Sequence, residues 1–211
     1  MSYIQFDRVS FSYPDSLEPV FSDLTLRLDS DWKLGLAGRN GKGKTTLLKL
    51  LCGEVRGTGR ITANLRFRRF PCDISDSAKP LFELAEEIAL GAELWQVVRE
   101  MSLLGLSEEF LSRPLNTLSG GERTKFLLAA AFAGEGYPLL DEPTDHLDEA
   151  GRKTLAGYLS DKRGFLVVSH DRAFLDGCCD HILSLNRTGA ELVRGNYSVW
   201  REARDRAEQS D

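Results

Sequence analysis

Residues 38–45 read GRNGKGKT and match the pattern GxxxxGK[ST]. The apolar strand pattern WKLGLA precedes them and the helical pattern KTTLLKLLC follows. In this context the glycines let backbone N–H groups turn inward around phosphate oxygens, and the helix adds the positive end of its dipole. Lys44 should reach the β- and γ-phosphates of a nucleotide, and the Thr45 hydroxyl should hold Mg²⁺. The predicted phosphate site comprises Gly38, Arg39, Asn40, Gly41, Lys42, Gly43, Lys44, Thr45 and Thr46.

Two further segments end in polar side chains that complete this chemistry. The short apolar run before Asp141 and Glu142 predicts a strand that delivers two carboxylates to one edge of a sheet. Asp141 is expected to bind the magnesium shell and Glu142 to polarise the attacking water. The buried strand pattern before His170 predicts that its imidazole emerges at the same edge, where it could contact the γ-phosphate.

The elements that must position these residues alternate between strands and helices. Period-two alternation predicts half-buried strands at residues 4–6, 24–28 and 32–36, and a further strand pattern runs through residues 60–70. Helices are predicted at residues 44–52, 119–132 and 149–159, and helical spacing also appears in residues 80–111. Two further strands are predicted to end at residues 140 and 169. A hairpin is predicted at 181–197, with its turn at 186–189. This order indicates an α/β fold with a mostly parallel sheet and flanking helices.

Length and composition indicate a folded globular protein of one domain, or of one domain with a small appendage. The 211 residues are 42% hydrophobic and carry a net charge of -5, which does not favour binding of the whole chain to nucleic acid. No apolar run approaches the ~20 residues of a membrane span, and no signal-peptide pattern opens the sequence, so we expect a cytoplasmic protein without direct membrane insertion. Cys178, Cys179 and His181 could be drawn as a metal site, but core packing is the favoured interpretation.

The motif between the two phosphate-site segments identifies a family resemblance. Leu118 to Glu122 read LSGGE, which resembles the signature of ATP-binding-cassette (ABC) ATPases, in the order Walker A, signature, Walker B, D-loop and switch histidine. The resemblance covers nearly the whole chain and implies a P-loop NTPase core with a small antiparallel β subdomain and a helical insert. It implies that Tyr13 stacks on adenine and that Asp148 belongs to the D-loop. It also implies that the signature acts in trans on ATP held by a second cassette, through Ser119, Gly120, Gly121 and Glu122.

Finer features resemble one group within that family. DEPTDHLD, VSHDRAFLD and GNYSVW are similar to ABC-F proteins, in which two cassettes are fused and act on the ribosome. The stretches ELWQVVREMSLLGL and KRGFLVVSHDRAFLDGCCDHILSLN are similar to the first cassette of the antibiotic-resistance members. This resemblance implies an ATPase that needs a second cassette, expected in the same full-length chain, for full activity. Three departures are Asp145 where Asn is usual, Arg123 where Gln is commoner, and Cys72 where the Q-loop glutamine is expected.

A second function stays open for the chain, and a run of arginines has two possible interpretations. The ATPase subunit of a membrane ABC transporter would share every Walker and signature residue, whereas an SMC-type DNA-repair cassette is disfavoured because no long heptad segment interrupts the chain. A run of arginines without acids could contact ribosomal RNA or be an ordinary solvated face; it comprises Arg56, Arg60, Arg66, Arg68 and Arg69.

The expected organisation is a single cassette over residues 1–211. Residues 1–73 and 119–198 would form the ATPase core with its β subdomain, and residues 74–118 the helical subdomain. The charged residues 199–211 have little apolar face and are expected to begin a linker helix.

Overall fold

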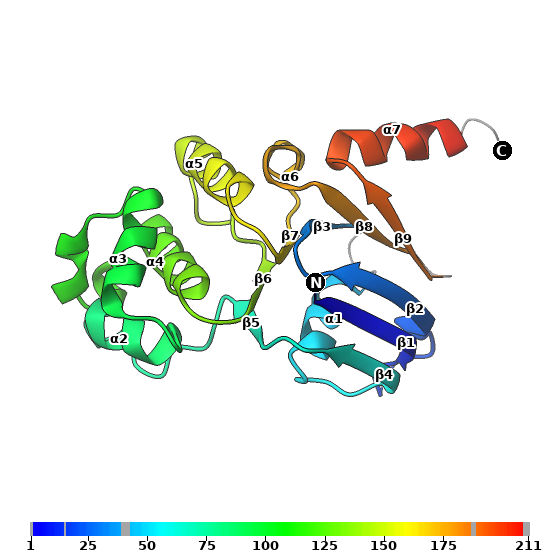
Figure 1. Cartoon of the computed structure of the whole chain (residues 1–211), viewed down its shortest axis with the longest axis horizontal. Helices are drawn as coiled ribbons and strands as arrows, with labels where there is room; N and C mark the ends of the chain where they lie inside the picture. Colours follow the sequence, from blue (N-terminus) through cyan, green and yellow to red (C-terminus); the bar gives the residue numbers. More distant parts are fainter. Residues whose placement is uncertain (1, 15, 39–42, 187–188, 209–211) are drawn as a thin grey trace.

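The computed structural model describes residues 2–14, 16–38, 43–186 and 189–208, and a six-stranded sheet forms its centre (Figure 1). The strand order is β5-β6-β7-β3-β8-β9. All neighbours run parallel except β9, which is antiparallel to β8. The bounds are β3 Lys33–Ala37, β5 Phe67–Phe70, β6 Tyr137–Asp141, β7 Phe165–Val168, β8 His181–Asn186 and β9 Gly189–Arg194. The predicted mostly parallel sheet is therefore confirmed, as is the antiparallel pairing of the hairpin strands; residues 187–188 between them lie outside the described residues.

A second, three-stranded sheet is antiparallel and has the order β2-β1-β4. Its strands are β1 Tyr3–Phe11, β2 Phe21–Asp29 and β4 Thr58–Ala63. The prediction of one strand pattern through residues 60–70 is wrong, because the chain bends at residues 64–66 and its two halves enter different sheets. Periodicity could not separate them, since apolar residues continue at period two across the bend, at Ile61, Ala63, Leu65 and Phe67.

The parallel strands bury both of their faces. Leu139 and Leu140 are adjacent on β6 and fully buried, yet they belong to two separate hydrophobic clusters. One cluster joins the sheet to α1 (Lys44–Leu51) and the small sheet, and the other joins it to α5 (Glu149–Ser160) and α6 (Arg172–Cys178). Burial on both faces explains why these strands are continuous apolar runs in the sequence.

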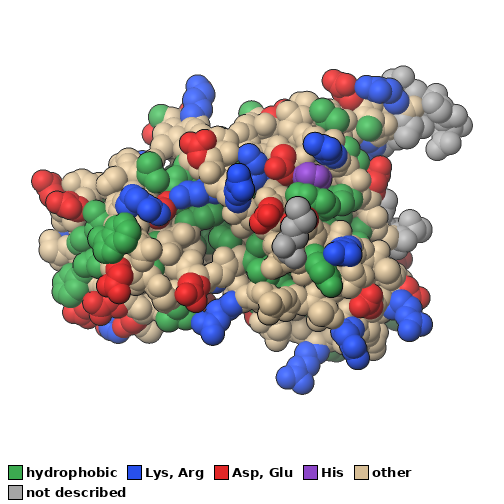
Figure 2. Space-filling model, viewed as in Figure 1, with side chains coloured by type: hydrophobic (Ala, Val, Ile, Leu, Met, Phe, Trp, Pro, Cys, Tyr) green, Lys and Arg blue, Asp and Glu red, His purple; other side chains and the backbone are tan. Residues whose placement is uncertain are grey.

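Helices gather at the end of the molecule beyond β5 and β6 (Figure 1). They are α2 (Leu81–Ile88), α3 (Leu94–Leu103) and α4 (Gly120–Ala133), with two short 3₁₀ turns at Glu108–Ser112 and Leu115–Thr117. In Figure 2 green side chains lie on the outer surface of this end. Its exposed apolar residues are Phe82, Leu90, Trp95 and Leu103.

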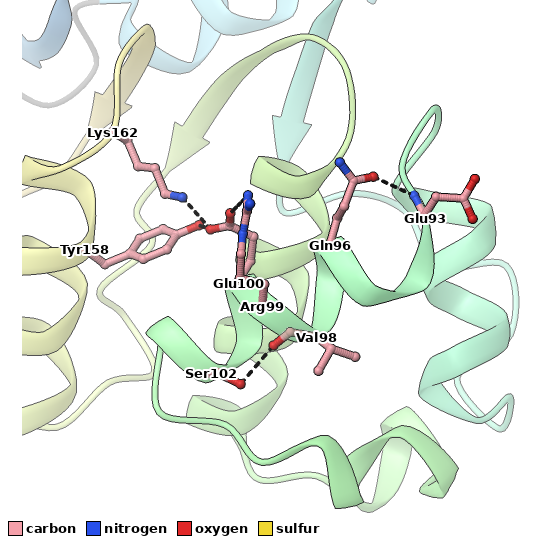
Figure 3. Close-up of polar contacts among 8 residues, drawn as sticks. All are labelled: Glu93, Gln96, Val98, Arg99, Glu100, Ser102, Tyr158 and Lys162. Carbon is pink, nitrogen blue, oxygen red and sulfur yellow. Dashed lines mark hydrogen bonds and ion pairs between the residues drawn. The ribbon is translucent and has the colours of Figure 1, made fainter.

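A buried ionic cluster joins α3 to the end of α5 (Figure 3). The Glu100 side chain is 1% exposed and accepts hydrogen bonds from the Tyr158 hydroxyl at 2.6 Å and from Arg99 at 2.9 Å. Lys162 also donates to this carboxylate. Burial by itself raises the pKa of Glu100, but these three hydrogen bonds outweigh it and hold the pKa below its ordinary value. Glu100 on α3 therefore joins the helical region to Tyr158 on α5 and to Lys162 just after it.

The C-terminal part of the chain differs from its prediction. Helix α6 was not predicted, because its seven residues are too few to show a helical period. Helix α7 runs over Tyr197–Glu208, so it begins before the predicted boundary at 199, and its Trp200 is 3% exposed and belongs to the core. Within the described residues, no helix combines the length and apolar character that a membrane span needs.

Candidate nucleotide-binding site

The phosphate loop links the end of β3 to the start of α1. Arg39, Asn40, Gly41 and Lys42 lie outside the described residues. Gly43 caps α1 with φ 90°, and a Cβ there would lie 2.6 Å from Cγ1 of Val20, so only glycine fits. Lys44 is 8% exposed, and its Nζ donates to the Gly38 carbonyl at 2.9 Å. The ammonium group therefore lies beside the residue that follows β3.

The first turn of α1 presents two hydroxyl groups in different settings. Thr45 is exposed, whereas Thr46 is 6% exposed and its Oγ1 lies 3.0 Å from the Tyr13 hydroxyl. The Tyr13 ring packs edge-on against Phe11 with 4.9 Å between centroids and remains 38% exposed. An aromatic face is thus fixed beside the start of α1 and open on one side.

The Asp141 carboxylate at the end of β6 has an unexpected partner. Arg69 Nη2 lies 3.2 Å from Asp141 Oδ2, while Nη1 of the same guanidinium lies 2.8 Å from Glu54 Oε2. The parallel pairing of Arg69 with Leu139 brings this side chain to the carboxyl end of β6. Sequence reasoning missed this residue, because only the strand order shows that β5 lies next to β6.

Glu142 and His170 contact each other across the ends of β6 and β7. Glu142 Oε2 accepts the backbone N–H of His170 at 3.1 Å, and Oε1 lies 3.0 Å from His170 Nε2. Glu142 has φ 49°, a strained left-handed conformation that turns the chain as it leaves β6. Burial raises the pKa of the Glu142 carboxyl, although the backbone N–H and imidazole of His170 favour its charged form.

The signature segment forms the start of α4. Ser119 and Glu122 make reciprocal hydrogen bonds, with Ser119 N–H donating to Glu122 Oε2 at 2.8 Å and Glu122 N–H to Ser119 Oγ at 3.3 Å. Gly120 approaches His146 so closely that a Cβ would lie 3.2 Å from the His146 Cβ. Among the described residues, none of the signature lines the pocket beside Lys44.

Asp148 and Cys72 occupy the positions of the D-loop and Q-loop. Asp148 Oδ1 accepts the Gly151 N–H at 2.7 Å and so caps α5. Cys72 lines a cavity of about 330 Å³ that also reaches Asp141 and Glu142. Burial raises the pKa of the Cys72 thiol, so this side chain stays a neutral thiol beside the carboxylates.

The basic run does not form one continuous surface. Arg56, Arg60 and Arg66 are exposed, but Arg69 faces Asp141, and Arg68 is partly buried and donates to the Ile88 carbonyl. The interpretation of Arg68 and Arg69 as part of a nucleic-acid-contacting face is therefore wrong. Both lie on β5, the edge strand beside β6, where the Ile88 carbonyl accepts a hydrogen bond from Arg68 and the carboxylates of Glu54 and Asp141 accept hydrogen bonds from Arg69.

The donors near the phosphate loop fit Mg²⁺. Thr45 offers an exposed hydroxyl and Asp141 a carboxylate, and Mg²⁺ prefers such oxygen ligands combined with substrate phosphates. Within the described residues, no cluster of three or more His, Cys, Asp or Glu side chains could hold a metal.

The proteins that this chain resembles are consistent with a nucleotide-binding site at the ends of β3, β6 and β7. Residues 21–145 match the family model described as ABC transporter. ATP-binding cassette sub-family F member 3 of Homo sapiens is 32% identical over 209 residues, which cover 94% of this chain and 29% of that protein. Elongation factor 3 of Mycosarcoma maydis is 33% identical over 197 residues, 90% of this chain and 18% of that protein. The chain thus spans less than a third of either relative.

Solved structures share the fold at low identity. A dimeric bacterial ABC transporter cassette superposes with a TM-score of 0.76 at 18% identity and covers 90% of this chain and 98% of that one. A bacterial Atm1-family ABC exporter with ATP bound gives 0.77 at 18% identity, covering 100% of this chain and 42% of that one. These matches confirm the predicted α/β fold with its small antiparallel sheet. The chain belongs to the ABC transporter family and is an ATP-binding cassette of that family.

Proposed function

We propose that this chain is the ATP-hydrolysing cassette of an ABC-F protein that acts on the ribosome, as a translation factor or in antibiotic resistance by ribosome protection. The observation that carries the ATPase part is the convergence of Lys44, Asp141, Glu142 and His170 at the ends of β3, β6 and β7. The names of the relatives, a sub-family F member and an elongation factor, support the ribosomal part.

Nucleotide binding would use residues around the start of α1. The exposed face of Tyr13 would stack on the adenine, and any base offers a suitable π face. Residues 38–46 would surround the phosphates, with Lys44 supplying a cation in a site otherwise built of backbone amides. Thr45 and Asp141 would hold Mg²⁺, which neutralises phosphate charge when it is bound.

Hydrolysis would depend on the Glu142 carboxylate. The backbone N–H of His170 fixes one oxygen by a hydrogen bond, and the other oxygen lies 3.0 Å from the imidazole Nε2. A carboxylate held this way can polarise a water aimed at the γ-phosphate. The His170 side chain is 60% exposed, so its ring can also meet the terminal phosphate of a bound nucleotide.

The signature would work on a different cassette. Ser119 caps α4 with its neighbours Gly120 and Gly121, which gives a helix start with backbone donors. Because none of these residues lines the pocket beside Lys44 within the described chain, a second cassette is expected to bring its own signature to this nucleotide. Asp148, at the D-loop position, would lie near the same interface. We propose the division into core (1–73, 119–198) and helical subdomain (74–118); the linker start predicted at 199–211 falls on α7, which begins at Tyr197 and whose Trp200 packs in the core.

The test uses the full-length protein with Glu142→Gln, together with the matching change in a second cassette if the chain continues into one. We expect the ATP-closed form to persist and the protein to co-sediment with purified ribosomes in ATP but not in ADP. Replacing the exposed Arg56, Arg60 and Arg66 by Ala should lower this co-sedimentation and its salt dependence if they contact rRNA. Empty ribosome pellets in ATP would refute the ribosomal assignment.

The second candidate is the ATPase subunit of a membrane transporter. The same cassette geometry would serve it, and the two solved structures named above are an exporter and a transporter cassette. In the same experiment this candidate predicts that the trapped protein remains with membranes and leaves the ribosome fraction.

A further inference from the structure

A pocket of about 440 Å³ lies between the phosphate loop and helix α7. Ala37, Gly38 and Lys44 line it from the end of β3 and the start of α1. The segment after β7 contributes His170 and Arg172. Leu36 and Ser169 also line it, and helix α7 contributes the other four residues, so this helix forms part of the surroundings of the proposed nucleotide site.

The residues of α7 that line this pocket occupy a single helical face. They are Tyr197, Trp200, Arg201 and Arg204, spaced i, i+3, i+4 and i+7. We call this set the α7 face. Two of its members are aromatic and two carry a positive charge, so the helix turns one mixed apolar and cationic stripe toward the loop.

The first turn of α7 is fixed to the cassette. The Ser198 N–H donates to Asp176 Oδ1 at 2.7 Å, and the Ser198 hydroxyl donates to Oδ2 of the same carboxylate at 2.5 Å. Trp200 is 3% exposed within the core that includes α6. These contacts hold the α7 face against the pocket, so its arginines are positioned by the fold.

The charge around the pocket is positive. Its described lining includes Lys44, His170, Arg172, Arg201 and Arg204, and no carboxylate. Carboxylates lie next to some of these groups: Asp205 pairs with Arg201 at 3.0 Å, and a Glu142 oxygen lies 3.0 Å from His170 Nε2. Arg172 lies 5.9 Å from the Tyr197 ring and Arg204 5.7 Å from the Trp200 ring, which orients both guanidinium groups over aromatic faces. A cavity lined in this way attracts an anion.

We propose that the α7 face binds the terminal phosphate of a nucleoside triphosphate held by the phosphate loop of the same chain. This inference rests on the proposed function, because Lys44 on the facing wall is the residue expected at the β- and γ-phosphates. A phosphate held there faces the guanidinium groups of Arg201 and Arg204, whose planar forks match phosphate oxygens. A diphosphate lacks that group, so α7 distinguishes the two nucleotide states.

The test compares binding of a non-hydrolysable ATP analogue, AMP-PNP, with binding of ADP, both with Mg²⁺, by calorimetry. The variant Arg201→Gln/Arg204→Gln should lose about tenfold in AMP-PNP affinity and less than about twofold in ADP affinity. Arg206→Gln is the matched control, since this arginine lies on the same helix outside the α7 face and pairs with Glu202 at 3.1 Å. The pair of conservative changes Arg201→Lys/Arg204→Lys should restore part of the preference.

Hydrogen exchange gives a second readout that needs no substitution. Backbone amides of residues 201–206 in the unaltered chain should exchange more slowly with AMP-PNP than with ADP. The proposed role of α7 would be overturned if Arg201→Gln/Arg204→Gln lost equal affinity for AMP-PNP and ADP, or bound both as the wild type does. It would also be overturned if hydrogen exchange of residues 201–206 were the same with both nucleotides. Failure of the unaltered chain to bind either nucleotide would instead overturn the proposed function, so the two failures are distinguishable.

Discussion

One residue, His170, lies close to both carboxylate oxygens of Glu142. Oε2 accepts the His170 backbone N–H at 3.1 Å and Oε1 lies 3.0 Å from its Nε2. The two residues end neighbouring strands and are 28 positions apart in sequence. The carboxylate that we propose polarises water is thus contacted by the segment proposed to meet the γ-phosphate.

Glu142→Gln keeps the size of the side chain but removes its charge. ATP binding should persist while hydrolysis falls by about 10²-fold or more, because the amide cannot polarise water. Calorimetry and a phosphate-release assay measure the two effects separately. Asp145→Asn is a suitable control, since that carboxylate is exposed and adjacent but makes no hydrogen bond to His170 in the described structure. Equal hydrolysis by wild type and Glu142→Gln would rule out this role.

Tyr13→Ala should weaken the binding of adenine and guanine nucleotides alike, by about 1–3 kcal/mol, because stacking on an aromatic face does not depend on the base. Tyr13→Phe retains the ring and removes only the hydroxyl contact to Thr46, so it should bind nearly as wild type. Titration with ATP and GTP measures both variants. A loss confined to one base would indicate hydrogen-bond recognition instead of stacking.

Arg69→Gln removes the cation that lies 3.2 Å from Asp141 and 2.8 Å from Glu54. We expect the chain without ligand to lose about 1 kcal/mol of stability, a small value because these side chains are partly exposed. Mg²⁺ with ADP should reduce that loss, since the metal supplies Asp141 with another positive partner. Thermal unfolding with and without the ligand measures the difference, with the exposed Arg66→Gln as control. An identical loss in both conditions would count against this account.

Glu100→Gln should destabilise the chain by about 1.5–3 kcal/mol at pH 7, because it weakens charged hydrogen bonds in a buried site. The pKa of Glu100 is depressed by the fold, so this stabilisation is complete above the ordinary value of 4.5 and is lost as the pH falls through the lower pKa of the folded state. Urea unfolding of both proteins from pH 7 downward should show the difference shrinking below about pH 4.5. A difference that is constant with pH would show that the charge of Glu100 does not matter.

The sequence by itself determined the local chemistry and the main architecture. The spacing of Gly38 to Thr45 requires a turn between a strand and a helix, and the apolar runs before Asp141 and His170 predict strands buried on both faces. Parallel strands present their carboxyl ends at one edge, so these residues were expected to meet, and the Glu142 and His170 contact agrees. Such inferences succeed because they depend on backbone conformation and burial within a few residues.

The tertiary structure alone decided which partner each charged side chain takes. Arg69 resembles its neighbours Arg66 and Arg68 in the sequence, but the place of β5 beside β6 turns it to Asp141. Trp200 and Arg204 lie in a charged stretch with little apolar pattern, yet the packing of α7 on α6 buries one and brings the other to the phosphate loop. Contacts between residues far apart in the chain depend on strand order and helix docking, which no local period encodes.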